Sequence, residues 1–434
     1  MIDWQARYFD FLSLIEKTFI GIRKTVAKNL SHLLIAFFLL SRGEPTRNGR
    51  ISISAISRAM IVKAKPKNRY KRLNRFLDNP RFNIEAMVPG FLYLIFGEEP
   101  LALVPLIFDQ TTIRGVEVLY CSVPFEGRAL PIGLTTFEYG SIEVSQNTIE
   151  WCFFKHLIDH LPDWMLAVFI LDRGYSRIDL LHDFNQHKVL FIVRGRQNVS
   201  VKIGGRWLSL GRLRHRVGKA VRYRNVLLRR NKSELADIII YREKGFKEPW
   251  FLIVPAGVEE VLSTAKVVEL YRERMQIEVK FRDLKTHLGV RGLQLEVRKG
   301  ERLGRLLIAL ALVYIILVIL GAGELGAEIR PLVEVLRPRA RHGTRRTLSV
   351  LLIGCRLLDD PFLVPVKIII DLLKQMISLV IQRKGLINIL HSQPPYFKLW
   401  DRDYKFKKDS SAIKNINCII HNKHLARVCL LHFP

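Results

Sequence analysis

The chain has 434 residues, and 49% of them are hydrophobic, which excludes a chain too polar to bury a core and allows one large core or two to three domains. Its 69 Lys and Arg outnumber its 40 Asp and Glu, giving a formal net charge of +29. An imbalance of this size favours a polyanionic partner, nucleic acid or an anionic membrane surface, over a generally basic, solvated surface. We expect nucleic acid.

The first 95 residues are expected to be helical, because apolar residues recur at three- and four-residue intervals. A basic stretch follows within this region, from Arg58 to Arg75, with Tyr70 and Phe76 interleaved. Small helices followed by a basic helix that bears aromatic residues are typical of a reader of DNA ends, so we expect Arg72 and Arg75 to contact DNA. The alternative is a solvated basic helix.

From Leu101 the pattern changes to strands. Three short apolar or alternating runs predict an antiparallel set of three strands; they span residues 104–108, 116–123 and 130–137. A helix over about 146–160, a strand over 165–171, a helix over about 177–186 and a strand over 189–193 come next. Three strands, helix, strand, helix, strand is the order of a ribonuclease-H-like sheet, so the predicted class is α/β.

Residues 188–232 contain fourteen Lys or Arg and no Asp or Glu. Apolar residues alternate with the basic ones, which predicts a β-rich insertion with a cationic face rather than an unstructured tail. We expect Arg212 and Arg214 on this face to contact DNA. A strand at 250–254 then leads into a long helix.

The uncharged stretch from Leu306 to Leu320 raises the possibility of a membrane span. It is shorter than the roughly 20 apolar residues that a bilayer requires, so a buried core helix is the preferred interpretation. Residues 364–381 predict an amphipathic helix, and the chain beyond about residue 390 predicts a loosely ordered tail. The five cysteines lack the spacing of zinc ligands and no signal peptide precedes them, so we expect reduced thiols in a cytosolic protein.

Two acidic residues follow apolar runs that read as strands. Asp109 follows residues 104–108, and Asp172 follows residues 168–171. Burying a carboxylate at the end of a central strand is costly, so both positions suggest metal ligands. For either alone, a helix cap or a turn residue is the more common role.

The long helix supplies a third acid. Turning about 100° per residue, it would place Tyr271, Arg274, Glu278 and Lys285 within an arc of about 60°. A carboxylate flanked by two cations and a phenol is suited to hold a metal ion, while the neighbouring side chains bind phosphates. The contiguous Tyr241-Arg242-Glu243-Lys244 contains the same four residue types without the spacing of the helical set, so we do not expect it to form the site.

These motifs resemble the DDE transposases of bacterial insertion sequences that carry the YREK signature (the IS-four type). The resemblance covers residues 55–320 and rests on Asp109-Gln110-Thr111-Thr112, Asp172-Arg173-Gly174-Tyr175 and the spaced set of Tyr271, Arg274, Glu278 and Lys285. It implies a catalytic core with Asp109, Asp172 and Glu278 holding two Mg²⁺ or Mn²⁺ ions. It also implies that Tyr271, Arg274 and Lys285 hold phosphates, and that Trp250 receives a flipped base.

The resemblance further implies cleavage at element ends through a hairpin intermediate, joining to target DNA, a homodimer on DNA and a cytoplasmic, nucleoid-associated location in a bacterium or archaeon. The expected domains are a DNA-end-binding region (1–95), a catalytic domain (96–320) with its insertion (about 196–255), a helical region (321–390) and a tail (391–434). Two alternatives stay open: a catalytically inactive relic that binds DNA or inhibits transposition, and, more remotely, a membrane protein. For Trp250, packing within the sheet is an equal alternative.

Overall fold

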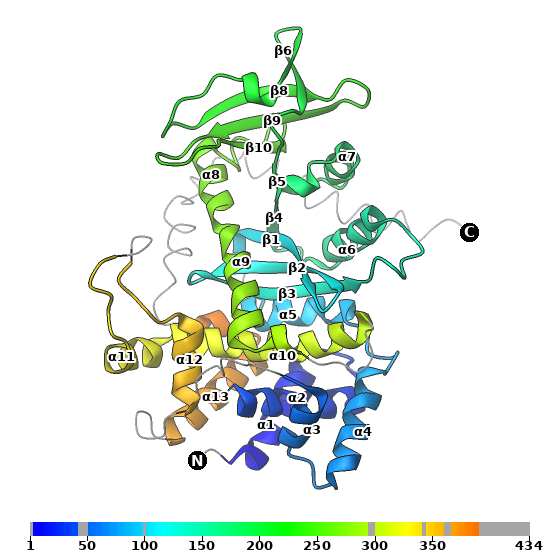
Figure 1. Ribbon diagram of the computed structural model, residues 1–434, viewed down its shortest axis with the longest axis vertical. Coiled ribbons are helices and arrows are strands. Elements are labelled where there is room, and N and C mark those ends of the chain that lie inside the picture. The colour runs from blue at the N-terminus through cyan, green and yellow to red at the C-terminus, as the bar shows by residue number, and fades with distance from the viewer. Residues whose placement is uncertain are drawn as a thin grey trace. The chain divides into compact units, whose positions relative to one another are not determined.

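The computed structural model describes residues 3–41, 51–98, 101–293, 300–340, 344–359 and 366–389 (Figure 1). Its contacts group the chain into two units. Unit 1 comprises residues 1–99, 105–160 and 269–392, and unit 2 comprises 100–104, 161–268 and 393–434. The predicted tail lies outside the described residues, and the predicted domain boundaries stay predictions.

The N-terminal part of unit 1 is helical, as the apolar spacing predicted. Its elements are α1 (Trp4–Thr18), α2 (Lys24–Leu40), α3 (Ile53–Ala59), α4 (Pro66–Leu77), the 3₁₀ turn η1 (Glu85–Met87) and α5 (Val88–Phe96). Asp3 caps α1 by accepting hydrogen bonds from two backbone N–H groups, and Ser52 caps α3 by accepting one from Ala55 N. Aromatic rings of Trp4, Phe11 and Phe38 join α1 to α2.

His32 lies within this helical core, 8% exposed, with its ring stacked on Tyr8 at a centroid distance of 4.4 Å. Burial and the charge of Arg72 lower the pKa of His32 to about 4. The pKa in the unfolded chain is near 6.5, so below that pH the unfolded state takes up a proton that the folded state does not. The free energy of unfolding should therefore fall as the pH falls from about 6.5 to about 4, by up to about 3 kcal/mol.

Urea denaturation across this pH range measures the effect. His32→Phe keeps the ring that stacks on Tyr8 and removes the titrating group, so its stability should lose this part of the pH dependence. His160→Gln, a change at an exposed histidine, is the control and should leave the dependence intact. An unaltered profile for the His32→Phe protein would contradict the prediction.

The sheet of unit 1 consists of three antiparallel strands in the order β3-β2-β1. They are β1 (Leu101–Ile113), β2 (Val116–Phe125) and β3 (Arg128–Phe137), followed by α6 (Gln146–His160). On one face, Phe108 contacts Phe153 and Phe154 of α6. Side chains alternate along a strand, so Asp109 and its register partner Tyr120 belong to the other face.

The sequence placed Asp109 at the end of its strand, and that prediction is wrong. β1 continues for four residues to Ile113, and Asp109 pairs with Tyr120 in the interior of the ladder. The reason is the hairpin turn at Arg114-Gly115, whose φ values of 56° and 84° let β1 and β2 pair up to the turn. The polar residues after Asp109 extend the strand instead of ending it.

Unit 2 contains the remaining strands, in the order β4-β5-β10-β9-β8-β6-β7. They are β4 (Met165–Leu171), β5 (Leu190–Arg194), β6 (Ser200–Ile203), β7 (Arg206–Ser209), β8 (Val221–Leu228), β9 (Glu234–Tyr241) and β10 (Trp250–Pro255). The 3₁₀ turns η2 (Arg173–Tyr175) and η3 (Leu210–Arg212) and the helix α7 (Ile178–Gln186) connect them. β4 and β5 are parallel, and the other described pairings are antiparallel.

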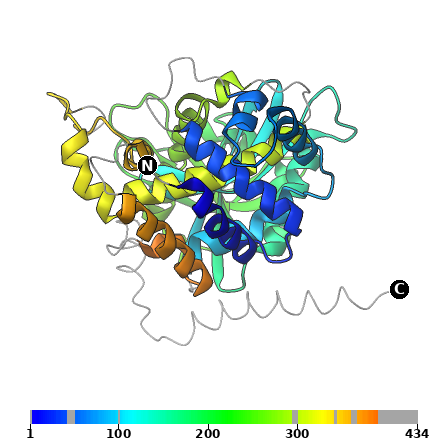
Figure 2. The same cartoon turned by 90° about the horizontal axis from the view of Figure 1, so that it is seen from below.

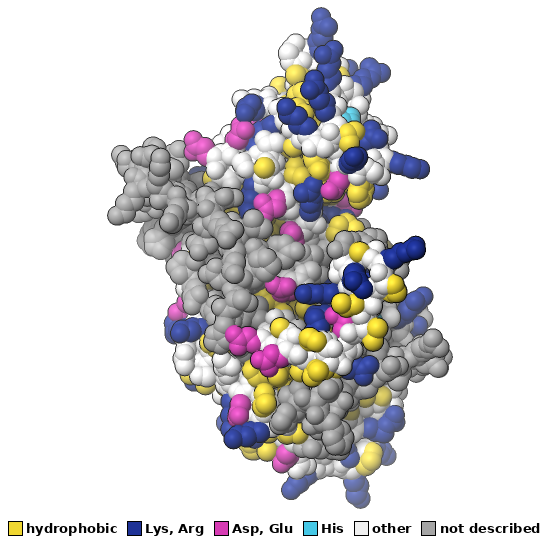
Figure 3. Space-filling model, turned by 90° about the vertical axis from the view of Figure 1, so that its left-hand side faces the viewer, with side chains coloured by type: hydrophobic (Ala, Val, Ile, Leu, Met, Phe, Trp, Pro, Cys, Tyr) yellow, Lys and Arg dark blue, Asp and Glu magenta, His cyan; other side chains and the backbone are white. Residues whose placement is uncertain are grey.

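The predicted succession along the chain is confirmed: three antiparallel strands, α6, β4, α7 and β5, an α/β fold of the ribonuclease-H-like order. The β-rich insertion is also present as β6 to β9. Lys and Arg side chains gather over these strands at the upper end of Figure 3.

The remainder of unit 1 begins with the end of α8 (Thr264–Glu273), continues through α9 (Met275–Arg282), the π-turn η4 (Asp283–His287) and η5 (Val290–Gly292), and reaches α10 (Gly300–Ala322). The helices α11 (Glu324–Val333), α12 (Val350–Asp359) and α13 (Val366–Ile381) and the turn η6 (Leu386–Ile389) follow. The predicted amphipathic helix is confirmed as α13, whose buried residues Ile369, Leu373, Met376 and Val380 form one stripe. That helix lies against α1 (Figure 2).

Among the described residues, α10 is the one helix long and apolar enough to cross a membrane, and its apolar stretch is 100% buried. It contacts β3, α2 and α12. At the crossing with α12 the backbones approach closely, because a Cβ on Gly354 would lie 1.9 Å from the Leu317 carbonyl oxygen. Packing within unit 1 therefore accounts for the apolar composition that suggested a membrane span.

Candidate active site

Two of the three predicted acids meet at one guanidinium. Arg274 Nη1 donates to Asp109 Oδ2 at 3.1 Å, and its Nη2 donates to Glu278 Oε1 at 2.9 Å. The Arg274 side chain is 7% exposed, whereas those of Asp109 and Glu278 are 23% and 47% exposed. Asp109 thus comes from the interior of β1, and Glu278 from α9, 169 positions later. Both carboxylates contact the same guanidinium and are partly exposed to solvent.

The helix that bears Glu278 differs from the continuous helix expected from the sequence. α8 ends at Glu273 and α9 begins at Met275, with i→i+3 bonds from Arg274 N to Tyr271 O and from Ile277 N to Arg274 O. Beyond α9 a π-turn spans Asp283–His287, and each of its residues rotates less about the axis than an α-helical residue. The arc of about 60° predicted for a continuous helix is therefore interrupted at two places, at Arg274 and at the π-turn.

Lys280 lies beneath the site and is fully buried. Its Nζ donates to Ser122 Oγ at 2.8 Å and lies 3.5 Å from the centroid of the Tyr120 ring, on the sheet face that Asp109 shares. Burial holds the pKa of Lys280 well below its usual value, while the charges of Cys121 and Asp109 act in the opposite direction. Sequence analysis missed this residue, because nothing in the pattern separates a buried Lys from the exposed ones around it.

Asp172 directly follows β4 in unit 2, as predicted, and its backbone carbonyl accepts a hydrogen bond from Tyr175 N. Among the residues that the structure describes, no three His, Cys, Asp or Glu side chains gather closely enough to hold a metal ion. The three-acid metal site therefore stays a prediction, and the structure brings together its Asp109–Glu278 part.

The other members of the spaced signature have different environments. Tyr271 is 3% exposed, and the guanidinium carbon of Arg274 lies 6.0 Å from its ring centroid. Lys285 lies in the π-turn and lines a separate hollow of about 380 Å³ in unit 1. Phosphate contacts by these residues stay predictions.

Trp250 is the first residue of β10, where it pairs with Tyr241 at a ring distance of 5.8 Å. Its neighbours Pro249 and Phe251 line a hollow of about 510 Å³ within unit 2, together with Arg173, the residue after Asp172. Arg212 and Arg214 are both exposed on the insertion. DNA contact by Trp250, Arg212 and Arg214 stays a prediction.

The two arginines predicted to contact DNA ends, Arg72 and Arg75, differ in their exposure to solvent. Arg75 is exposed on α4, whereas Arg72 is partly buried and its Nε donates to Asn29 Oδ1 at 2.7 Å. Arg72 therefore ties α4 to α2 within unit 1. Further anchorage comes from α10, where Arg302 and Arg305 are buried and bond to Asn74 and the Leu77 carbonyl of α4.

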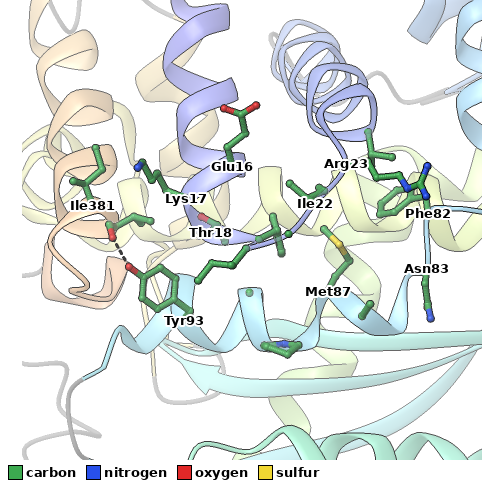
Figure 4. Close-up of a pocket in the computed structure, with 18 of the residues that line it drawn as sticks. Glu16, Lys17, Thr18, Ile22, Arg23, Phe82, Asn83, Met87, Tyr93 and Ile381 are labelled. Carbon is green, nitrogen blue, oxygen red and sulfur yellow. Dashed lines mark hydrogen bonds between the residues drawn. The ribbon is translucent and has the colours of Figure 1, made fainter.

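A larger hollow of about 870 Å³ in unit 1 lies away from these residues (Figure 4). It is bounded by the α1–α2 turn, α5 and the end of α13, and Tyr93 in its wall donates to the Val380 carbonyl at 2.6 Å. None of the predicted site residues lines it. The acid pair is the better candidate for chemistry, because two carboxylates converge there on one guanidinium.

A buried ion pair supports the π-turn. Asp283 is fully buried, its Oδ2 lies 2.6 Å from Arg128 Nε of β3, and it accepts a hydrogen bond from Tyr314 of α10. Burial raises the pKa of Asp283, an effect that Arg128 opposes. The pairing of Asp283 was not predicted from sequence, because its partners lie far along the chain and give no local signal.

Residues 146–316 match a protein-family model described as a transposase DDE domain. The match includes Asp172 and Glu278, and Asp109 precedes it; it supports a DDE transposase. No curated protein matches the chain. Among solved structures, the chain is similar to one titled "Cryo-EM structure of piggyBac transposase synaptic complex with hairpin DNA (SNHP)", with 12% identity, a TM-score of 0.41, and coverage of 91% of this chain and 87% of that chain.

Proposed function

We propose that the protein is a transposase that binds the ends of an insertion sequence, cleaves the DNA there through a hairpin intermediate, and joins the ends to target DNA. The match of residues 146–316 to the transposase DDE domain supports the general class. The finer assignment, to the enzymes with the spaced YREK signature, rests on the residue pattern around Glu278.

The observation that carries the proposal is the convergence of Asp109 and Glu278 on Arg274. Two carboxylates held at one cation, both partly open to solvent, fit the oxygen donors that Mg²⁺ and Mn²⁺ prefer. Asp109, Asp172 and Glu278 would hold these ions. Bound metal would supply Lewis-acid activation of water and of the departing oxygen in phosphodiester cleavage.

The protein's own side chains then bind and orient DNA. Arg274 offers a planar fork that can pair with a phosphate as well as with the carboxylates that it now contacts. Tyr271 and Lys285 would contact phosphates near the cleavage point, and Trp250 would stack on a base that leaves the helix. Arg75, Arg212 and Arg214 would bind the backbone farther away.

Two further features complete the proposal. DNA joining requires two element ends in one complex, for which we propose a homodimer, and the net charge of +29 suits association with the nucleoid in the cytoplasm.

The test is cleavage of duplexes that carry the DNA flanking the gene, where inverted repeats would identify the substrate. With Mg²⁺ or Mn²⁺ the full-length protein should nick the repeat ends and yield hairpin and joined products, resolved on denaturing gels. Specific binding without any strand cleavage in Mn²⁺ would instead identify an inactive relic. Failure to bind or cut these ends would overturn the proposal.

A further inference from the structure

Between the β1–β2 turn and the π-turn of unit 1 lies a hollow of about 380 Å³. Of the described residues that line it, four are basic and none is acidic; the basic ones are Arg114, Arg282, Lys285 and Arg291. Thr112 and Thr286 add hydroxyl groups to the lining. Lys285 alone was expected to bind phosphate; the spacing of the signature gave no reason to include the three arginines.

We propose that this hollow, which we call the arginine hollow, binds a phosphate group of a DNA strand. The inference rests on the proposed function for its ligand, and it extends that function to three arginines outside the spaced signature. Guanidinium groups match phosphate with paired N–H donors, so several arginines around one recess form a site for this anion.

The backbone conformation at Arg114 indicates which substitution can test the proposal. Arg114 and Gly115 occupy the two central positions of the β1–β2 turn with φ of 56° and 84°. Turns of this kind favour Asn-Gly, because a side chain in the left-handed region is strained unless it is Asn, Asp or Gly. An arginine at this position costs stability that Asn would not, so Asn can replace it without straining the turn.

The π-turn forms the opposite wall of the arginine hollow, and hydrogen bonds fix its conformation. Lys285 lies within the π-turn, which the Leu288 N to Asp283 O bond closes at 2.9 Å and Gly289 ends with a φ of 72°. Asp283 is anchored by Arg128 and Tyr314, so the turn is fixed from beneath. π-turns often occur at functional sites.

Electrostatics within the arginine hollow favour an anion. Burial lowers the pKa of Lys285, and the nearby charge of Arg291 lowers it further. Glu117 acts in the opposite direction, but it is 8% exposed and accepts hydrogen bonds from Gln110 and Thr112. A phosphate would relieve the repulsion among the four cations.

The experiment measures binding of a fixed duplex to the full-length protein across about 50 to 200 mM salt. Loss of one phosphate contact lowers the slope of log affinity against log salt by roughly 0.9. We expect Arg114→Asn and Arg291→Gln each to lower the slope by about this amount, uniformly across sequences. If both arginines hold the same phosphate, the double variant should show little further change.

Arg339→Gln, which removes an exposed arginine of unit 1 outside the expected DNA-end-binding region, is the matched control and should leave the slope unchanged. Arg114→Asn also guards against misfolding, because Asn suits the turn and should leave the melting temperature equal or higher. Comparing strands with and without a 5′-phosphate distinguishes a terminal phosphate from a phosphodiester within the strand.

Slopes for the two variants equal to that of Arg339→Gln would overturn the inference. The proposed function would still stand if cleavage of element ends persisted. Conversely, a lowered slope in a protein that never cleaves DNA would support the arginine hollow and remove the transposase assignment.

Discussion

Glu278→Gln should lower Mg²⁺-dependent strand cleavage on the order of 10²–10³-fold while leaving DNA binding largely intact. Gln has the shape of Glu and can still accept the hydrogen bond from Arg274 Nη2, so the local structure should persist. It lacks the negative charge that a hard divalent cation requires. Single-turnover cleavage of an end duplex, measured against Mg²⁺ concentration, gives the effect.

Glu243→Gln is the matched control, because it makes the same chemical change within the contiguous Tyr241-Arg242-Glu243-Lys244 of unit 2. Its cleavage rate should equal that of the unaltered protein. Asp109→Asn should resemble Glu278→Gln, since both carboxylates contact the same guanidinium. Undiminished cleavage by either variant would remove Asp109 and Glu278 from the catalytic assignment.

Asp283→Ala should reduce the free energy of unfolding by roughly 3–5 kcal/mol, because it leaves Arg128 without its buried partner. The Arg128 side chain is 12% exposed and that of Asp283 is 0% exposed, so water cannot readily replace the lost contact. Denaturant unfolding monitored by circular dichroism measures the loss.

A double-mutant cycle separates the ion pair from the rest of the network. Arg128→Met combined with Asp283→Ala removes both charges and should recover part of the stability lost in Asp283→Ala alone. Lys155→Met with Asp159→Ala, which removes an exposed pair on α6, should show little coupling. Equal, small effects for both cycles would show that the buried pair does not support the π-turn.

Regular elements were predictable because local pattern determines them. The bounds predicted for the helix at 146–160 and the strand at 165–171 agree with α6, where apolar residues recur at helical spacing, and with β4, a continuous apolar run typical of a buried strand. Asp172 could be placed after its strand for the same reason. Both acids of the observed pair were identified from sequence.

The geometry of the site could not be predicted from sequence, because it depends on contacts between residues far apart in the chain. The extension of β1 past Asp109 depends on pairing with β2, and the break at Arg274 and the π-turn depend on contacts with other elements. Neither the burial of Lys280 against Tyr120 nor the pairing of Asp283 with Arg128 follows from spacing, since each joins residues far apart in the chain. Arg114 was missed because the predicted strands ended at residue 108 and resumed at 116, so the tight turn at Arg114-Gly115 was not located.

The burial of α10 has a consequence for synthesis of the protein on the ribosome. α10 is complete at Ala322, but α12, which packs against it, is complete only at Asp359. Until α12 emerges, part of a 23-residue apolar helix has no covering partner, the kind of surface that chaperones bind and that drives aggregation. Expression of chains that stop short of α12 should therefore yield insoluble protein, so catalytic fragments should retain α12.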